Sequence, residues 1–164
     1  MKTFPLNQTQ LAIFYAEQSA EGNYAINFLH HYGENVNLEK LCRAIEKMVA
    51  AHPHLMDRIT LDDEGTPVFV VPEDKHYVQT IEQISTIDEV RASLIHKRDL
   101  LHGPLFTFRV MQGQDGGHLL FDVHHVISDG LTIGTLLKDI ETAYAGGELT
   151  EEPVTAEQMN LAEA

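Results

Sequence analysis

The spacing of apolar residues along the chain predicts four helices. Between residues 37 and 51, apolar side chains recur every three or four positions, which is the period of a helix with one buried face. Asn37 stands where a helix N-cap is preferred, and Pro53 lies just beyond the end, where it cannot continue the helix. Three further helices are predicted, over 6–18, from Thr86 onward and over 131–144.

Short apolar or alternating segments between these helices predict strands. They lie at 24–32, 55–62, 68–71, 77–81, 105–112 and 118–123. Turn residues at 63–67 and 113–117 separate two pairs of strands in the manner of hairpins. Helices packed on one face of a mixed, largely antiparallel sheet would give an α+β fold, a two-layer α/β sandwich.

Length and composition fit one domain with a sizeable core. The chain has 164 residues, of which 43% are hydrophobic and 22% are charged, as expected of a globular protein. The single cysteine, Cys42, excludes an internal disulfide and fits a reducing compartment. After Gly146 and Gly147 the sequence becomes acidic and rich in small residues, so we expect 148–164 to be an acidic tail or a linker.

The net charge of −14 narrows the class of partners. Nucleic acid binding needs a basic face, and the sequence shows none, so we expect no nucleic acid partner. An anionic membrane surface is excluded on the same ground. The sequence has no apolar run of about 18 residues and no signal-peptide core at its start, so we expect a cytoplasmic protein.

Adjacent histidines mark the junction between the last predicted strand and the last predicted helix. Successive side chains on a strand point to opposite faces, so an extended His124 and His125 cannot both address one site. This spacing argues against a two-histidine metal site and places Asp122 on the face of His124. Asp129 is placed to cap the following helix or to stand in its first turn, and Gly130 permits a sharp change of direction.

The sequence HHVISDG at 124–130 matches the HHxxxDG signature of the chloramphenicol-acetyltransferase-like acyltransferases. Its flanks narrow the resemblance to the condensation domains of nonribosomal peptide synthetases. These flanks are PLNQTQ at 5–10, RDLLHGPLF at 98–106 and LLKDI at 136–140. The family's full domain is built from two such lobes, and the resemblance covers only the N-terminal one, here residues 1–147.

The resemblance implies thioester aminolysis, in which an amine attacks an acyl thioester presented by a peptidyl or acyl carrier protein. His125, the second histidine, would be the catalytic base or orienting group, and His124 would be structural. No cofactor would bind directly, because the substrates are tethered through phosphopantetheine on the carrier proteins.

The resemblance also gives Asp129 a structural role, in a salt bridge that shapes the motif loop. The family partner is an arginine after the second helix, and Met56 occupies that position here. Arg58 lies two residues on, so it is the candidate substitute for that arginine.

The remaining candidate residues are assigned to structure. Ten histidines show no metal-ligand spacing such as HExxH, so we expect no metal site, and His52 is expected to serve packing. Ser128 is expected to make a loop or capping contact. On the second helix, Lys40, Arg43 and Lys47 are expected to form a solvated face, with a docking patch for an acidic carrier protein as the alternative.

Three functions remain open at this point. The first is the N-terminal lobe of a condensation domain, inactive without its C-terminal lobe and able to associate with itself across an exposed face. The second is a compact homo-oligomer that acetylates a small molecule with coenzyme A. The third is a degenerate lobe that binds a carrier protein without catalysis. Met56, which replaces the family arginine, supports this third function.

Overall fold

The strands form two sheets in the computed structural model, which describes residues 2–19, 24–93, 98–128, 130–150 and 156–163. The smaller sheet has the order β1-β4-β3 and is antiparallel throughout. Its strands are β1 (Lys2–Pro5), β3 (Arg58–Leu61) and β4 (Pro67–Val71). The larger sheet has the order β2-β7-β6-β5, in which only β5 and β6 run parallel. Its strands are β2 (Ala25–Gly33), β5 (Ile81–Gln83), β6 (Phe106–Gly113) and β7 (Gly116–His124).

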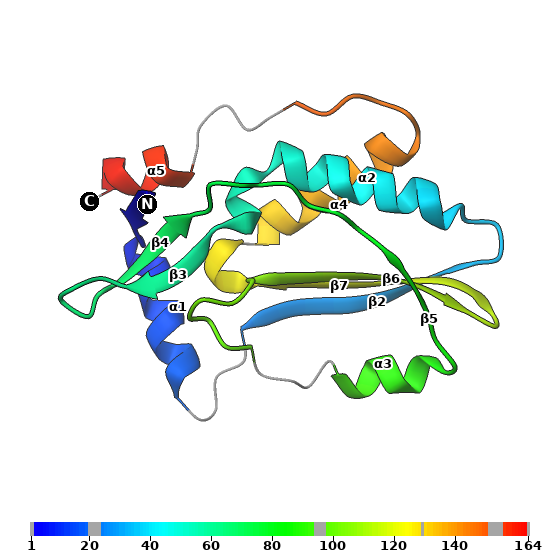
Figure 1. Ribbon diagram of the computed structural model, residues 1–164, viewed down its shortest axis with the longest axis horizontal. Coiled ribbons are helices and arrows are strands. Elements are labelled where there is room, and N and C mark those ends of the chain that lie inside the picture. Colours follow the sequence, from blue (N-terminus) through cyan, green and yellow to red (C-terminus); the bar gives the residue numbers. More distant parts are fainter. Residues whose placement is uncertain (1, 20–23, 94–97, 129, 151–155, 164) are drawn as a thin grey trace.

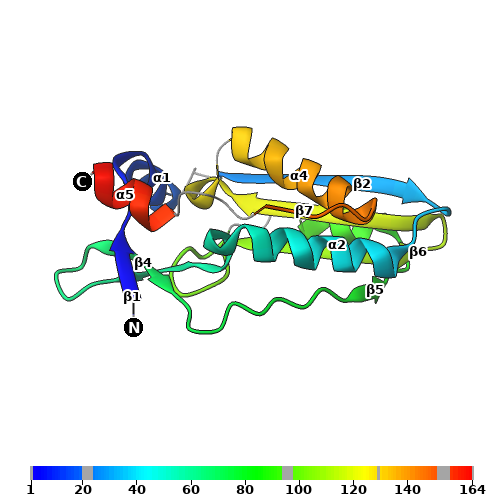
Figure 2. The same cartoon turned by 90° about the horizontal axis from the view of Figure 1, so that it is seen from above.

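Helices α2 and α4 lie side by side over one face of the larger sheet (Figures 1 and 2). The α-helices of the described residues are α1 (Gln8–Gln18), α2 (Leu38–Ala51), α3 (Ile87–Ser93), α4 (Gly130–Tyr144) and α5 (Ala156–Glu163). Two short 3-10 helices are η1 (Pro53–Met56) and η2 (His125–Ile127). The predicted α+β fold with a mixed, largely antiparallel sheet is confirmed.

The core lies between the larger sheet and the pair α2 and α4. Phe121 on the central strand β7 pairs in register with Phe28 on β2 and Phe108 on β6, and the ring centroids lie 5.1 and 5.0 Å apart. Fully buried Ile45 of α2 and Leu136 of α4 belong to the same cluster. Cross-strand aromatic contacts of this kind fix the register of the strands that carry the histidine pair.

Helix α3 corrects the expectation that the helices pack on one face of the sheet. It lies on the face opposite α2 and α4 (Figure 1). There Val90 of α3 forms a second, smaller buried cluster with Met111 of β6 and Leu120 of β7. Strand β7 is therefore buried on both of its faces, and its apolar side chains require cover on each side.

Several element boundaries differ from the sequence-based expectation. The segment predicted as one strand over 55–62 begins as η1, because Pro53 starts a helical turn there. The strand predicted at 77–81 lies later, as β5. Side chains hold the preceding segment instead: Gln79 donates its backbone N–H to Glu46 Oε2 (2.9 Å) and its Nε2 to the Phe108 carbonyl (2.9 Å).

The C-terminal segment contains a helix that was not predicted. Helix α5 lies beside β1 and α1 (Figure 2). Buried Asn160 donates Nδ2 to the Pro5 carbonyl (2.8 Å) and to Gln10 Oε1 (2.9 Å), while Glu157 pairs with Lys2 (2.6 Å). The boundary at residue 147 between lobe and tail stays a prediction. Among the described residues, every helix is too short or too polar to cross a membrane.

Candidate active site

The two adjacent histidines lie where β7 ends and η2 begins. His124 is the last residue of β7, and His125 is the first residue of η2. The His124 N–H donates to the Leu105 carbonyl (2.9 Å), and the His125 N–H donates to the Tyr24 carbonyl (2.9 Å). The backbone of the pair is therefore tied to segments on both sides of β7. The extended conformation ends at His124, so the alternation of faces does not extend to His125.

His124 is fully buried, and its two ring nitrogens have different partners. Its Nδ1 accepts a hydrogen bond from the Val126 N–H (3.0 Å). The neutral ring therefore carries its proton on Nε2. This Nε2 lies 3.4 Å from Oε2 of Glu17. Both contacts lie within the fold, and the structural role of His124 stays a prediction.

Glu17 is the residue at this site that the sequence reasoning missed. It lies on α1, only 2% exposed, and its Oε2 also accepts the Tyr24 N–H (3.0 Å). Glu17 stands three residues after Phe14, so it falls on the buried face of α1. A carboxylate in the apolar stripe of a helix needs a buried partner, and this was the available signal.

Two influences oppose each other on the pKa of His124. Burial lowers the pKa of His124, because the charged imidazolium loses its hydration. The Glu17 carboxylate raises that pKa, and Arg98 and Asp122 act in opposite directions with smaller effects. The net pKa of His124 lies below its ordinary value, so the ring is neutral at pH 7. The participation of Asp122 agrees with the prediction that it shares the face of His124.

A polar cavity adjoins the Glu17–His124 pair. It measures about 270 Å³ and is lined by Glu17, Gln18, Arg98, Asp99 and Leu100. Arg98 is held by the Pro104 carbonyl (2.8 Å) and Thr107 Oγ1 (2.9 Å), and its NH2 group lies 3.4 Å from Asp122. The cavity therefore offers a space for polar groups near the carboxyl end of β7.

His125 is partly exposed, in contrast to its neighbour. Its Nδ1 hydrogen-bonds to the Ser128 carbonyl. A carbonyl oxygen only accepts, so Nδ1 carries the proton and Nε2 of the neutral ring keeps a free lone pair. Ser128 closes the same turn, since its hydroxyl donates to the His124 carbonyl (3.2 Å). This contact is the loop contact predicted for Ser128.

Of the other motif residues, Asp129 lies outside the described residues. Gly130 is the first residue of α4, one residue before the predicted start of that helix. The guanidinium of Arg58 donates to the His102 carbonyl (3.0 Å) and lies largely in solvent. The pairing of Arg58 with Asp129 therefore stays a prediction.

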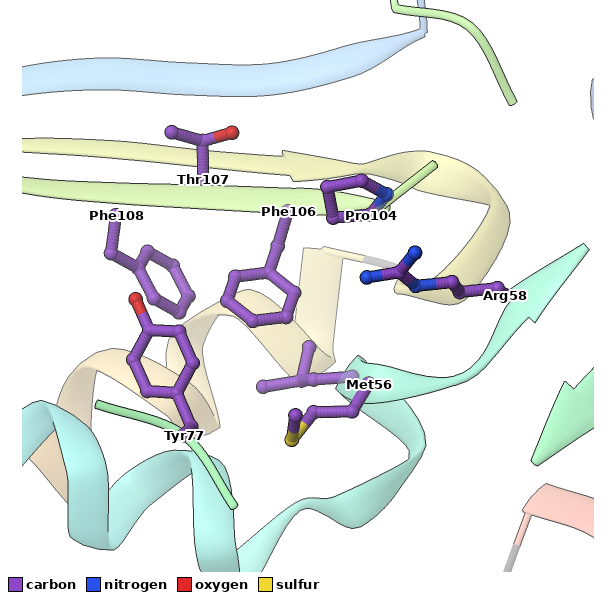
Figure 3. A pocket seen from close by; sticks show the side chains of 8 residues that line it. Met56, Arg58, Tyr77, Pro104, Phe106, Thr107 and Phe108 are labelled. Carbon is purple, nitrogen blue, oxygen red and sulfur yellow. The ribbon is translucent and has the colours of Figure 1, made fainter. Parts of the chain in front are cut away.

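Met56, at the family's arginine position, packs against the core and lines an apolar pocket of about 270 Å³. Figure 3 shows Phe106, Phe108 and Tyr77 gathered around this pocket, with Arg58 reaching in from one side. Burial raises the pKa of Tyr77 to about 12, so its hydroxyl is neutral. Phe106 pairs with Val123, which places the pocket one strand from the end of β7. No sequence pattern indicated this pocket.

Two further expectations concern side chains away from the histidine pair. His52 is buried, and its Nε2 contacts Asp139 of α4 at 2.5 Å, which agrees with a packing role. On α2, Arg43 pairs with Glu46 (3.1 Å), and Lys40 lies over the ring of Tyr144 at 4.8 Å. These local contacts agree with a solvated helix face.

Comparison with known proteins gives the family. Residues 1–160 match the condensation domain family. Surfactin synthase subunit 1 of Bacillus subtilis (strain 168) is 31% identical over 119 residues, which cover 71% of this chain and 3% of that protein. Bacitracin synthase 3 of Bacillus licheniformis is 28% identical over 152 residues, which cover 89% of this chain and 2% of that protein.

Solved structures share the fold. The first condensation domain of the calcium-dependent antibiotic synthetase, in complex with a substrate analogue, has a TM-score of 0.72 at 18% identity, covering 99% of this chain and 43% of that chain. The epimerization domain from the third module of tyrocidine synthetase B has a TM-score of 0.77 at 20% identity, covering 98% and 39%. The chain belongs to the condensation domain family and corresponds to the N-terminal part of these domains.

Proposed function

We propose that this chain is the catalytic N-terminal lobe of a peptide-synthetase condensation domain, with His125 as the group that handles the proton of the acceptor amine. The observation that carries this proposal is the hydrogen bond from His125 Nδ1 to the Ser128 carbonyl. It leaves a lone pair on Nε2 of a partly exposed ring within the HHxxxDG sequence.

The proposed reaction is aminolysis of a carrier-bound thioester. The amine nitrogen attacks the thioester carbonyl carbon, the C–N bond forms, and the C–S bond breaks as the thiolate of the phosphopantetheine arm leaves. Nε2 of His125 takes a proton from the attacking nitrogen and returns it to the departing sulfur. N–H groups at the start of α4 are the proposed donors to the oxyanion.

Glu17 and His124 support this role as positioning residues. The sealed His124 ring holds the Val126 N–H with Nδ1 and faces Glu17 with Nε2, so it fixes the first turn of η2 from beneath. That turn carries the carbonyl of Ser128 to which His125 donates. Hydrogen bonds from residues behind a functional histidine commonly fix the tautomer and orientation of its ring.

This chain corresponds to only part of each protein that it matches, which indicates what it would need to work with. The chain spans about two fifths of the solved condensation domain chain and a few per cent of the curated synthetases. We therefore propose that a second, C-terminal lobe completes the site, and that peptidyl or acyl carrier proteins deliver both substrates. Self-association through the face that the second lobe would cover is the expected behaviour of the isolated chain.

The test is amide formation in the presence of a C-terminal lobe from a related synthetase. The assay uses an acyl thioester and an amine, each on a carrier protein. His125→Ala is expected to lower turnover by about 10² to 10⁴-fold. His30→Ala is the matched control. It changes an exposed histidine farther along β2 and is expected to keep wild-type turnover. Full turnover in His125→Ala would discard the proposal.

The same assay separates the alternatives. A degenerate carrier-binding lobe would bind the carrier protein and show no turnover with or without His125. A coenzyme A-dependent acetyltransferase would elute as a stable homo-oligomer in gel filtration and acetylate a small amine without any carrier protein.

A further inference from the structure

Two histidines and an aspartate gather at the opposite end of the larger sheet from the histidine pair. His31 lies near the end of β2, His118 near the start of β7, and Asp115 in the turn between β6 and β7. His31 and His118 are cross-strand partners, and their rings stack with centroids 4.5 Å apart. Both rings turn the same nitrogen toward the aspartate.

The contacts within this group are short. His118 Nε2 lies 2.8 Å from Asp115 Oδ1. His31 Nε2 lies 2.8 Å from the Asp115 carbonyl oxygen and 3.7 Å from Oδ2. One ligand atom from each of the three side chains lies within 4.8 Å of the other two. Three possible ligands, one from β2 and two from the β6–β7 hairpin, thus lie close together.

We propose that His31, Asp115 and His118 form a binding site for a divalent transition-metal ion of the zinc class. Two imidazole nitrogens and one carboxylate oxygen would hold the ion, and water would complete its coordination. This ligand set suits Zn²⁺, Ni²⁺ and Cu²⁺, whereas Mg²⁺ and Ca²⁺ favour sites made of oxygen alone.

The geometry needs only side-chain adjustment to close around an ion. Zinc lies about 2.0–2.2 Å from such ligands, so in a tetrahedral site the ligand atoms stand about 3.4 Å apart. His31 and Asp115 are 50% and 63% exposed, so both can rotate and both are open to ions in solution. His118 is 4% exposed and supplies a fixed ligand. The ion would replace the Nε2 protons that now point at Asp115.

The local backbone leaves room for this cluster. A Cβ on Gly113 would lie 3.1 Å from Asp115 Oδ1 and 3.5 Å from His118 Nε2. Gly116 has a φ of +110°, and a Cβ there would stand 2.2 Å from the carbonyl carbon of Gly33. The turn is thus held against the end of β2, which places the ligands before any ion arrives.

Charge also favours a cation here. The Asp115 side chain is an anionic carboxylate at neutral pH, as a metal ligand must be. The net charge of −14 attracts cations to the whole surface.

The site is independent of the proposed acyl transfer. His118 and His124 are six residues apart on β7, a distance of about 20 Å along a strand. An ion at this end would join the β6–β7 turn to β2 and stabilise the native chain by mass action. Its expected effect is therefore on thermal stability, whatever the outcome of the transferase assay.

The experiment is a Zn²⁺ titration of the chelator-treated chain by calorimetry, with melting temperatures measured alongside. One Zn²⁺ per chain is expected, with a rise in melting temperature that Mg²⁺ does not produce. His31→Gln and Asp115→Asn are each expected to weaken binding by about tenfold or more, and the double variant to lose the thermal effect. Both residues are at least half exposed, so metal-free melting temperatures should stay close to wild type.

His30→Gln is the matched control, since it removes an exposed histidine next to the site on the same strand. It is expected to bind Zn²⁺ as the wild type does. The proposal is overturned if the wild-type chain binds no Zn²⁺ with one-to-one stoichiometry, or if the His31→Gln, Asp115→Asn double variant binds it as tightly.

Discussion

The two ends of β7 both bring histidine to a carboxylate, with opposite surroundings. At the carboxyl end, His124 and Glu17 are 0% and 2% exposed and face each other beneath η2. At the amino end, Asp115 lies in solvent, and His31 and His118 stack against each other beside it. Both groups combine imidazole with a carboxylate, but Glu17 and His124 are buried, whereas Asp115 and His31 are open to solvent.

The solvent exposure of the carboxylate therefore separates the two groups. The side chains of His124 and Glu17 are almost fully buried, so their value lies in fixing the shape of the turn above them. Solvent-exposed imidazole and carboxylate groups can release protons and bind a metal ion from solution. His125 stands between these cases, because Ser128 fixes its tautomer while its ring stays partly accessible.

The largest expected effect comes from removing the sealed ring. His124→Ala leaves the Val126 N–H without its acceptor, removes the imidazole that faces Glu17 and opens a cavity, so we expect a loss of about 3 kcal/mol in unfolding free energy. His125→Ala is expected to cost about 1 kcal/mol or less, because a single hydrogen bond of a partly exposed ring is lost. Urea unfolding of both variants measures these losses of stability. Equal losses in His124→Ala and His125→Ala would contradict the expected difference between the buried and the partly exposed ring.

Glu17→Gln tests the carboxylate of the sealed pair. We expect a loss of about 1 to 2 kcal/mol in stability, because an amide cannot replace the charge that faces His124 Nε2. The Glu17 carboxylate raises the pKa of His124, so the pKa of His124 should fall further in the variant. NMR titration of the His124 ring measures the shift. A rise in that pKa would show that Glu17 is not the partner.

The pH dependence of stability gives the next effect. An unfolded histidine has a pKa of about 6.5, and folding lowers the pKa of His124. Between the two pKa values the unfolded chain binds more protons, so stability falls as the pH drops below about 6.5. His124→Asn retains an acceptor for Val126 and should lack this part of the loss, whereas an identical pH profile would argue against a depressed pKa.

The smallest effect concerns Arg58 on the open surface. Arg58→Ala removes one hydrogen bond to the His102 carbonyl, so we expect a loss of about 0.5 to 1 kcal/mol. If Arg58 also pairs with Asp129, the double variant with Asp129→Asn should lose less than the sum of the two single variants. Unchanged melting in Arg58→Ala would discard the pairing, and full additivity would leave His102 as its partner.

Local sequence signals predicted much of the fold. The apolar period of α2 and its Asn37 cap indicated that helix, and the glycine-rich turn at 113–117 indicated the β6–β7 hairpin. The face shared by Asp122 and His124 followed from strand alternation. These features depend on neighbours in sequence, which a single chain reveals.

The features that were not predicted depend on contacts between distant segments. Glu17 joins the site only because α1 packs against η2. Helix α3 covers the face of the larger sheet opposite α2 and α4, where Val90 packs against buried side chains of β6 and β7. The spacing of histidines along the sequence could not show that His31 lies beside His118, because strand register, not a local motif, brings them together.

The decisive measurement is the tautomer of the two neighbouring rings, determined by long-range proton–nitrogen NMR on the chain at pH 7. We predict that His125 carries its proton on Nδ1 and keeps Nε2 as a free base, while neutral His124 carries its proton on Nε2. A His125 ring protonated on Nε2, with Nδ1 as the bare nitrogen, would contradict the proposed role of His125.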